Sequence, residues 1–166
     1  MPTSHTHPAA HRGRSLPALA AFFVLAYAVA AAGALASSNA AEVYASLDRP
    51  AWAPPAWLFG PVWTVLYATI AVAGWLVWRR AGDPGRRRAL AWWGVQLVLN
   101  LAWTPLFFGA RRYGLALVDI LFLVTAVVVT LRLFHRIDRS AGLLLIPYLA
   151  WVCFATALNG ALCGWG

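Results

Sequence analysis

The chain has 166 residues, of which 62% are hydrophobic and 11% are charged. Soluble domains carry about 25% charged residues, so this chain has too little polar surface to face water on all sides. Its basic excess, 13 arginines and no lysine against 5 acidic residues, lies in short clusters between apolar runs. That distribution is typical of loops that flank membrane spans. It argues against a nucleic-acid partner, which would need a continuous basic face.

Five apolar segments are each long enough to cross a bilayer, which takes about 20 residues. They cover residues 16–36, 57–78, 89–108, 113–131 and 141–162. The expected fold class is therefore all-α, a polytopic membrane bundle of five transmembrane helices. We expect one domain over residues 15–166, after a polar, disordered tail over residues 1–14. The one long connection is the Pro/Trp loop, residues 37–56.

The first segment has a second interpretation. Arg12 and Arg14, an apolar run, and an Ala-x-Ala pattern ending at Ala36 resemble a cleaved signal peptide. The apolar part of such a peptide has about 7–15 residues, whereas this run has 21. We therefore expect a first transmembrane helix here.

The arginines predict the orientation of the bundle. Ten of them fall in the tail, the 79–88 connection and the 132–139 connection, which share one side of the membrane. The other side carries Arg49, Arg111 and Arg112. The positive-inside rule then places the N-terminus in the cytoplasm and the Pro/Trp loop outside. We expect a multi-pass membrane protein that is located in a bacterial cell membrane.

The stretch from Pro50 to Tyr67 reads PAWAPPAWLFGPVWTVLY. Proline lacks a backbone donor and clashes inside a helix, so the first half is predicted to be irregular and stiff. Trp52 and Trp57 are thus carried on a rigid loop, and Trp63 is placed just inside the next helix. An aromatic flap at the mouth of a membrane bundle favours ligand binding.

Residues four apart share a helix face, and three such faces are predicted to line the bundle interior. They are Trp63, Tyr67, Ala71 and Gly74; Gln96, Asn100 and Thr104, with Trp103 beside them; and Pro147, Trp151, Ala155 and Asn159. Amides in lipid need partners, so the amides on these faces point inward. An apolar pocket with a few convergent polar groups predicts a binding site beneath the Pro/Trp loop.

Some of these residues have a structural interpretation as well. The amides of Gln96, Asn100 and Asn159 either bond one another between helices or meet a ligand, and their position below the loop favours the ligand. The indoles nearest the helix ends fit an interfacial aromatic belt. These are Trp75, Trp78, Trp92, Trp93 and Trp165.

Hydrolytic chemistry is not expected. Asp119, within the fourth span, is the only intramembrane carboxylate. Either a functional role or a hydrogen bond between helices would explain a carboxylate at this position. Cys153 and Cys163 lie about 15 Å apart on one helix, beyond disulfide reach. No metal-ligand spacing occurs outside a loose histidine group in the tail, so no metal is expected.

Four stretches together resemble the TspO/MBR family, the tryptophan-rich sensory proteins of bacteria and translocator proteins of mitochondria. They are RPAWAPPAWLFGPVWTVLY at 49–67, QLVLNLAW at 96–103, ALVDILFLV at 116–124 and LLIPYLAWVCFATALN at 144–159. The resemblance implies a five-helix bundle, commonly a homodimer in the lipid bilayer, that binds porphyrins. Protoporphyrin IX or heme is then the expected ligand, with no obligatory cofactor, and some members bind sterols.

The resemblance also implies a ligand-binding set. Its members are Tyr44, Trp52, Trp63, Tyr67, Gln96, Asn100, Trp151, Ala155 and Asn159, and the helix-face pattern adds Trp103. Light-dependent porphyrin breakdown in some relatives makes Trp63 and Trp151 the catalytic candidates. The end of the chain, LNGALCGWG, lacks the Tyr and Lys or Arg of a sterol pattern. The expected function is a porphyrin-binding receptor with a regulatory or trafficking role, with photo-oxidative degradation or sterol binding as alternatives.

Overall fold

A computed structural model describes residues 15–163 of the chain. Over this range the regular secondary structure is helical throughout and no strand occurs. In chain order, the first three α-helices of this range are α1 (Ser15–Ala36), α2 (Ala40–Ser46) and α3 (Phe59–Trp78). A 3-10 turn, η2 (Ala56–Leu58), precedes α3. The rest of the bundle is α4 (Arg86–Thr104), a π-helical turn η3 (Pro105–Gly109), α5 (Tyr113–Ile137), α6 (Arg139–Leu144) and α7 (Ile146–Cys163).

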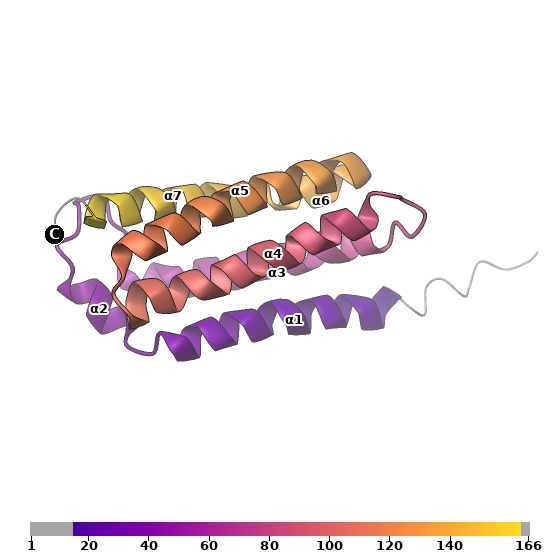
Figure 1. Ribbon diagram of the computed structural model, residues 1–166. Helices are drawn as coiled ribbons and strands as arrows, with labels where there is room; N and C mark the ends of the chain where they lie inside the picture. Colours follow the sequence, from indigo (N-terminus) through magenta and orange to yellow (C-terminus); the bar gives the residue numbers. More distant parts are fainter. Residues whose placement is uncertain (1–14, 164–166) are drawn as a thin grey trace, which may run out of the picture.

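The long helices run side by side, and α1 lies on the opposite side of the bundle from α5 and α7 (Figure 1). Between them, α3 and α4 both contact α1. The α5 helix packs on α4, α6 and α7, and α3 also contacts α6 and α7. The short helix α2 sits across one end of the bundle (Figure 1), which we call the loop end. The opposite end, where the 79–88 connection and the end of α5 meet, is the arginine-rich end.

Four helical segments of the described chain are long and apolar enough to cross a membrane. They are Leu16–Ala36, Ala56–Trp78, Tyr113–Ile137 and Arg139–Leu162. The expected count of five is therefore not matched, because α4 does not qualify. Its first turn is Arg86, Arg87 and Arg88, and its apolar part reaches its expected length only by continuing into η3.

The structure corrects three sequence boundaries. The Pro/Trp loop contains a helix, α2, which buries Val43 and Tyr44, whereas residues 50–55 are irregular as predicted. The 132–139 connection is not a loop, because α5 continues to Ile137 and carries Arg132 and Arg136 on its last turns. The fifth predicted segment is divided into α6 and α7.

One ion pair ties the arginine-rich end together. Asp138 accepts hydrogen bonds from Arg80 Nε at 3.1 Å and Nη2 at 2.7 Å. It also caps α6, accepting from the backbone N–H groups of Ser140 and Ala141. The hydrogen bond from Arg80 holds the pKa of Asp138 below its ordinary value. A single carboxylate thus joins the end of α3 to the α5–α6 junction.

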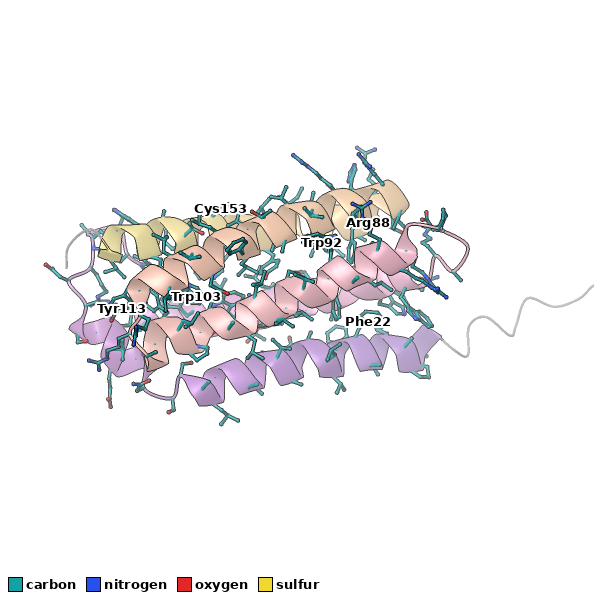
Figure 2. All side chains as sticks on the ribbon, in the orientation of Figure 1. Phe22, Arg88, Trp92, Trp103, Tyr113 and Cys153 are labelled. Carbon is teal, nitrogen blue, oxygen red and sulfur yellow. The ribbon has the colours of Figure 1, made fainter. Side chains whose placement is uncertain are left out.

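The half of the bundle nearer this end is densely packed. Phe22 of α1 meets Trp93 edge-on with ring centroids 5.1 Å apart, and it points toward the interior in Figure 2. A Cβ added at Gly74 would lie 2.9 Å from the Phe22 ring. Gly74 therefore leaves the notch into which Phe22 fits. Trp93 is buried and donates to the Ile70 carbonyl, so its assignment to the interfacial belt is wrong.

Candidate functional site

A cavity of about 440 Å³ lies at the loop end of the bundle. Its walls come from α1, α2, the start of α3 and the end of α4, and α2 lies across its outer side. This volume falls within the range of small-molecule sites, roughly 300–1,000 Å³. The space beneath the Pro/Trp loop that the sequence predicted is therefore present, but α1 rather than α7 forms its far wall.

The cavity exists because the side chains that face it from α1 are small. Ala30, Gly33, Ala34 and Ser37 follow the i, i+3, i+4, i+7 spacing of one helix face. On the opposite wall Gly60 of α3 adds no side chain. Helices that meet through such residues leave space unless their backbones close in.

Aromatic rings form the inner wall. Trp63 lies 5.5 Å from the Tyr67 ring and 6.3 Å from the Tyr148 ring, centroid to centroid. Trp103 of α4 stacks on Phe107 at 4.9 Å with 27° between the planes, close to the loop end of α4 in Figure 2. Flat apolar surfaces of this kind favour a flat, aromatic ligand.

A chain of buried hydrogen bonds forms the floor. The Tyr67 hydroxyl donates to Asn100 Oδ1 at 2.8 Å, and Asn100 Nδ2 donates to the Tyr148 hydroxyl at 3.0 Å. Tyr148 donates in turn to Gln96 Oε1 at 2.8 Å, and Gln96 Nε2 donates to the Trp93 carbonyl at 2.9 Å. Gln96 and Asn100 are thus joined through Tyr148. Asn100 also lines the cavity, whereas Gln96 does not.

Sequence reasoning missed Tyr148, the centre of this chain. It lies seven residues before Ala155 and eleven before Asn159, so helical spacing places all three on one face. The pattern taken from the sequence began instead at Pro147, which the structure places on the exposed surface of α7. The correct register was therefore available from the positions of Ala155 and Asn159.

The predicted residues of α7 do not line the cavity. Trp151 packs edge-on against Phe59, a cavity residue, with ring centroids 5.7 Å apart, and its buried indole N–H has no hydrogen-bond partner. Ala155 and Asn159 border a separate crevice of about 10 Å³. Asn159 accepts a hydrogen bond from Trp103 Nε1 at 3.2 Å and donates to the Tyr113 carbonyl at 3.1 Å.

At the loop end, Tyr44 lines the cavity. Its hydroxyl donates to the Pro54 carbonyl at 2.7 Å, which fixes α2 to the proline segment. The Arg49 guanidinium lies over the Tyr44 ring, 4.7 Å from its centroid. Burial raises the pKa of Tyr44 despite this cation. Trp52 lies outside the cavity, half exposed and edge-on to Phe154 at 5.7 Å.

The cavity is lined by uncharged side chains. Of the three cations predicted on the same side of the membrane as the Pro/Trp loop, Arg49 contacts a lining residue, while Arg111 and Arg112 are exposed in the short turn before α5. The cavity hydroxyls of Tyr27, Ser37 and Thr64 all donate to backbone carbonyls. A ligand in the cavity therefore meets an apolar, aromatic surface, and its charged groups find a cation only at the loop end.

The remaining predictions concern other places in the bundle. One carboxylate oxygen of Asp119 is buried without a hydrogen-bond partner, so the alternative of a helix–helix hydrogen bond does not account for that oxygen. Cys153 is free and exposed on α7, as Figure 2 shows. Residues 15–163 hold no cluster of three metal-ligating side chains. The tail histidines and Trp165 lie outside the described residues.

Comparison with known proteins identifies relatives over most of the chain. The TspO/MBR family matches residues 20–165. The human translocator protein is 43% identical over 118 residues, covering 70% of each chain. The tryptophan-rich protein TspO of Archaeoglobus fulgidus is 38% identical over 146 residues, covering 87% of this chain and 94% of its own.

A third relative has a name that fits the indole-rich site. The tryptophan-rich sensory protein of Cereibacter sphaeroides is 39% identical over 135 residues, covering 79% of this chain and 84% of its own. The family match extends over the α1, α3 and α4 walls of the cavity and over α7 behind it. This chain is a membrane protein of the TspO/MBR family.

Proposed function

We propose that this chain is a membrane receptor for porphyrin-like tetrapyrroles such as protoporphyrin IX, with a regulatory or trafficking role. The observation that carries the proposal is the uncharged, aromatic-walled cavity of about 440 Å³ at the loop end. Family membership supports it, because resemblance to the TspO/MBR family implies a porphyrin ligand. Heme is the closest competitor as a ligand, and the receptor needs no resident cofactor.

In this proposal the macrocycle lies against Trp63 and Tyr67, whose rings form one continuous wall. Its propionates extend toward Arg49, since no cation lines the interior of the cavity. Trp151 supports Phe59 from behind rather than stacking on the ligand. In this proposal the main stacking surface therefore lies on α3.

Titration of the purified protein with protoporphyrin IX, followed by quenching of tryptophan fluorescence, tests the proposal. Replacing Trp63 with Ala removes a wall of the cavity and should raise the Kd about tenfold. The matched control is Trp57→Ala, because Trp57 is 71% exposed and does not line the cavity. Equal affinities for the two variants would contradict the stacking arrangement, and an absence of saturable quenching in the wild type would end the proposal.

The membrane arrangement that we propose has five spans, with α4 and η3 together forming the third. The arginines at the start of α4 support this, because they would lie at the membrane surface while residues 89–108 cross. The N-terminus is then cytoplasmic and the loop end faces outward, in a bacterial cell membrane. Reporter fusions after residues 83 and 111 should report opposite sides, and the same side for both would refute a third span.

A homodimer in the bilayer remains part of the proposal. The small residues Ala26 and Ala30 do not provide its interface, because Ala26 is fully buried within the bundle and Ala30 lines the cavity. Cross-linking in native membranes should yield a species of twice the monomer mass. If only the monomer were detected under all cross-linking conditions, the proposed dimer would be refuted.

Light-dependent breakdown of the bound porphyrin is a second candidate function. It is favoured by two indoles, Trp63 and Trp103, that line the cavity directly. Illumination of the complex should then give a new absorbing product at a rate that exceeds bleaching of the pigment in detergent alone. Equal rates of pigment loss with and without the protein would exclude this second function, and only the receptor function would then remain.

A further inference from the structure

The cavity is not sealed on its α1–α3 side. Three of its lining residues are exposed there: Ala34 on α1, and Gly60 and Thr64 on α3. All three lie inside helical segments that are apolar and long enough to span the membrane. Exposed surface within a span meets lipid rather than water. The cavity therefore opens toward the hydrocarbon region beside the helices.

Small side chains line this opening. A Cβ added at Gly60 would meet no atom within 4 Å, and Ala34, the lining residue of α1 that is exposed here, carries only a methyl group. The hydroxyl of Thr64 donates to the Gly60 carbonyl of its own helix, so it offers no donor across the gap. Little polar desolvation therefore opposes an apolar molecule that passes here.

The opening ends at Tyr27 on the side nearer the arginine-rich end. The Tyr27 hydroxyl donates to the Thr64 carbonyl at 2.8 Å and so connects α1 to α3. Further toward the arginine-rich end, Phe22 occupies the notch at Gly74 and packs on Trp93. From Tyr27 toward the arginine-rich end, α1 and α3 are held together by these contacts. From Tyr27 toward the loop end, both helices line the cavity.

We propose that this gap is a lateral portal, through which flat apolar ligands dissolved in the bilayer enter the cavity between α1 and α3. The inference rests on the proposed function and specifies its substrate class as membrane-partitioned, amphipathic molecules. The charge distribution fits this class, because the portal and cavity are uncharged while Arg49 lies at the loop end. A ligand entering edge-first keeps its carboxylates at the membrane surface.

The test uses full-length protein in phosphatidylcholine vesicles, with protoporphyrin IX dissolved beforehand in the same lipid. Stopped-flow quenching of tryptophan fluorescence measures association, and transfer to empty vesicles measures dissociation. Replacing Gly60 with Phe narrows the portal from α3, and Ala34→Phe narrows it from α1 if the first variant does not fold. The matched control is Gly114→Phe, since Gly114 is exposed on α5 with no atom within 4 Å of an added Cβ.

Both portal variants should slow association and dissociation together, by about tenfold, while the control keeps wild-type rates. A change in dissociation alone would indicate a lining residue rather than a portal and would overturn the inference. Wild-type rates in the portal variants would overturn it as well. In either case saturable quenching of the wild type leaves the receptor function intact. Absence of that quenching would overturn the receptor function and the portal with it.

Discussion

The two halves of α1 meet opposite surroundings, although Ala26 and Ala30 lie one helical turn apart on it. Ala26 is fully buried, close to the level where Phe22 fills the notch at Gly74. Ala30 faces the cavity, together with Gly33 further along the helix. The difference arises from the surroundings: a large ring inserts into a glycine notch at one end, and small side chains of α1 face the cavity at the other. Packing at the first end is what permits a void at the second.

The packed end also explains why the cavity does not collapse. Interiors pack as densely as organic crystals, so an empty space persists only where its walls are held by other contacts. Here the hydrogen-bond chain from Tyr67 to Gln96 fixes α3, α4 and α7 directly below the cavity. The predictions that follow disturb the two ends separately.

The packed end should be disturbed most by Gly142→Ala. The new Cβ would lie 2.6 Å from the Cβ and 2.8 Å from the Cα of His135, and backbone atoms cannot move aside without separating α5 from α6. We expect the free energy of unfolding to fall by about 3 kcal/mol, measured by thermal denaturation in detergent. The control is Gly94→Ala, which meets no atom within 4 Å and should gain up to about 1 kcal/mol from helix propensity. Equal stability of the two variants would show that α5 and α6 are not in close contact.

The boundary between the two ends should respond to Tyr148→Phe. Loss of the hydroxyl leaves Asn100 Nδ2 and Gln96 Oε1 without partners, which should lower stability by about 1–2 kcal/mol. Tyr27→Phe is the matched control, because the Tyr27 hydroxyl makes one bond to a carbonyl at an exposed position and should contribute less. A larger loss of stability in Tyr27→Phe would show that the hydrogen bond from α1 contributes more than the buried hydrogen-bond chain.

Much of the fold could be predicted because it depends on local patterns. The positions of the apolar helices, the irregular proline segment and the position of Trp63 at the start of α3 all follow from composition and spacing. The end of α5 could not be placed, because arginines such as Arg132 occur both in loops and on helix ends that reach the membrane surface. The α2 helix was missed for a similar reason, since seven residues with a polar flank carry little periodic signal.

A smaller effect is expected from Asp138→Asn, which retains a cap for α6 but removes the charge that pairs with Arg80. Since the pKa of Asp138 is lowered, the pair stabilises the protein above the ordinary carboxyl pKa and loses this contribution as pH falls through the lowered pKa. Because the Arg80 side chain is 58% exposed, the gain should be at most about 1 kcal/mol. Melting temperatures of wild type and variant should differ at neutral pH and converge in strong acid. A constant difference at all pH values would refute the charge pairing.

The candidate site was predicted in part. Five of the ten expected ligand-binding residues line the cavity: Tyr44, Trp63, Tyr67, Asn100 and Trp103. Trp151, Ala155 and Asn159 lie behind its wall, because spacing along a helix gives a face but not the neighbour that this face meets. The contribution of α1 could not be foreseen at all. Its small residues carry no chemical signal, and their effect appears only when the opposite wall is known.

The central claim is that the cavity beside Ala30 binds the ligand. Ala30→Leu tests it most directly, with Ala26→Leu as its counterpart one turn away. The account predicts that Ala30→Leu retains the wild-type melting temperature and raises the Kd for protoporphyrin IX at least about tenfold, whereas Ala26→Leu lowers stability by about 1–3 kcal/mol through overpacking. Unchanged porphyrin affinity in a folded Ala30→Leu variant would contradict the account.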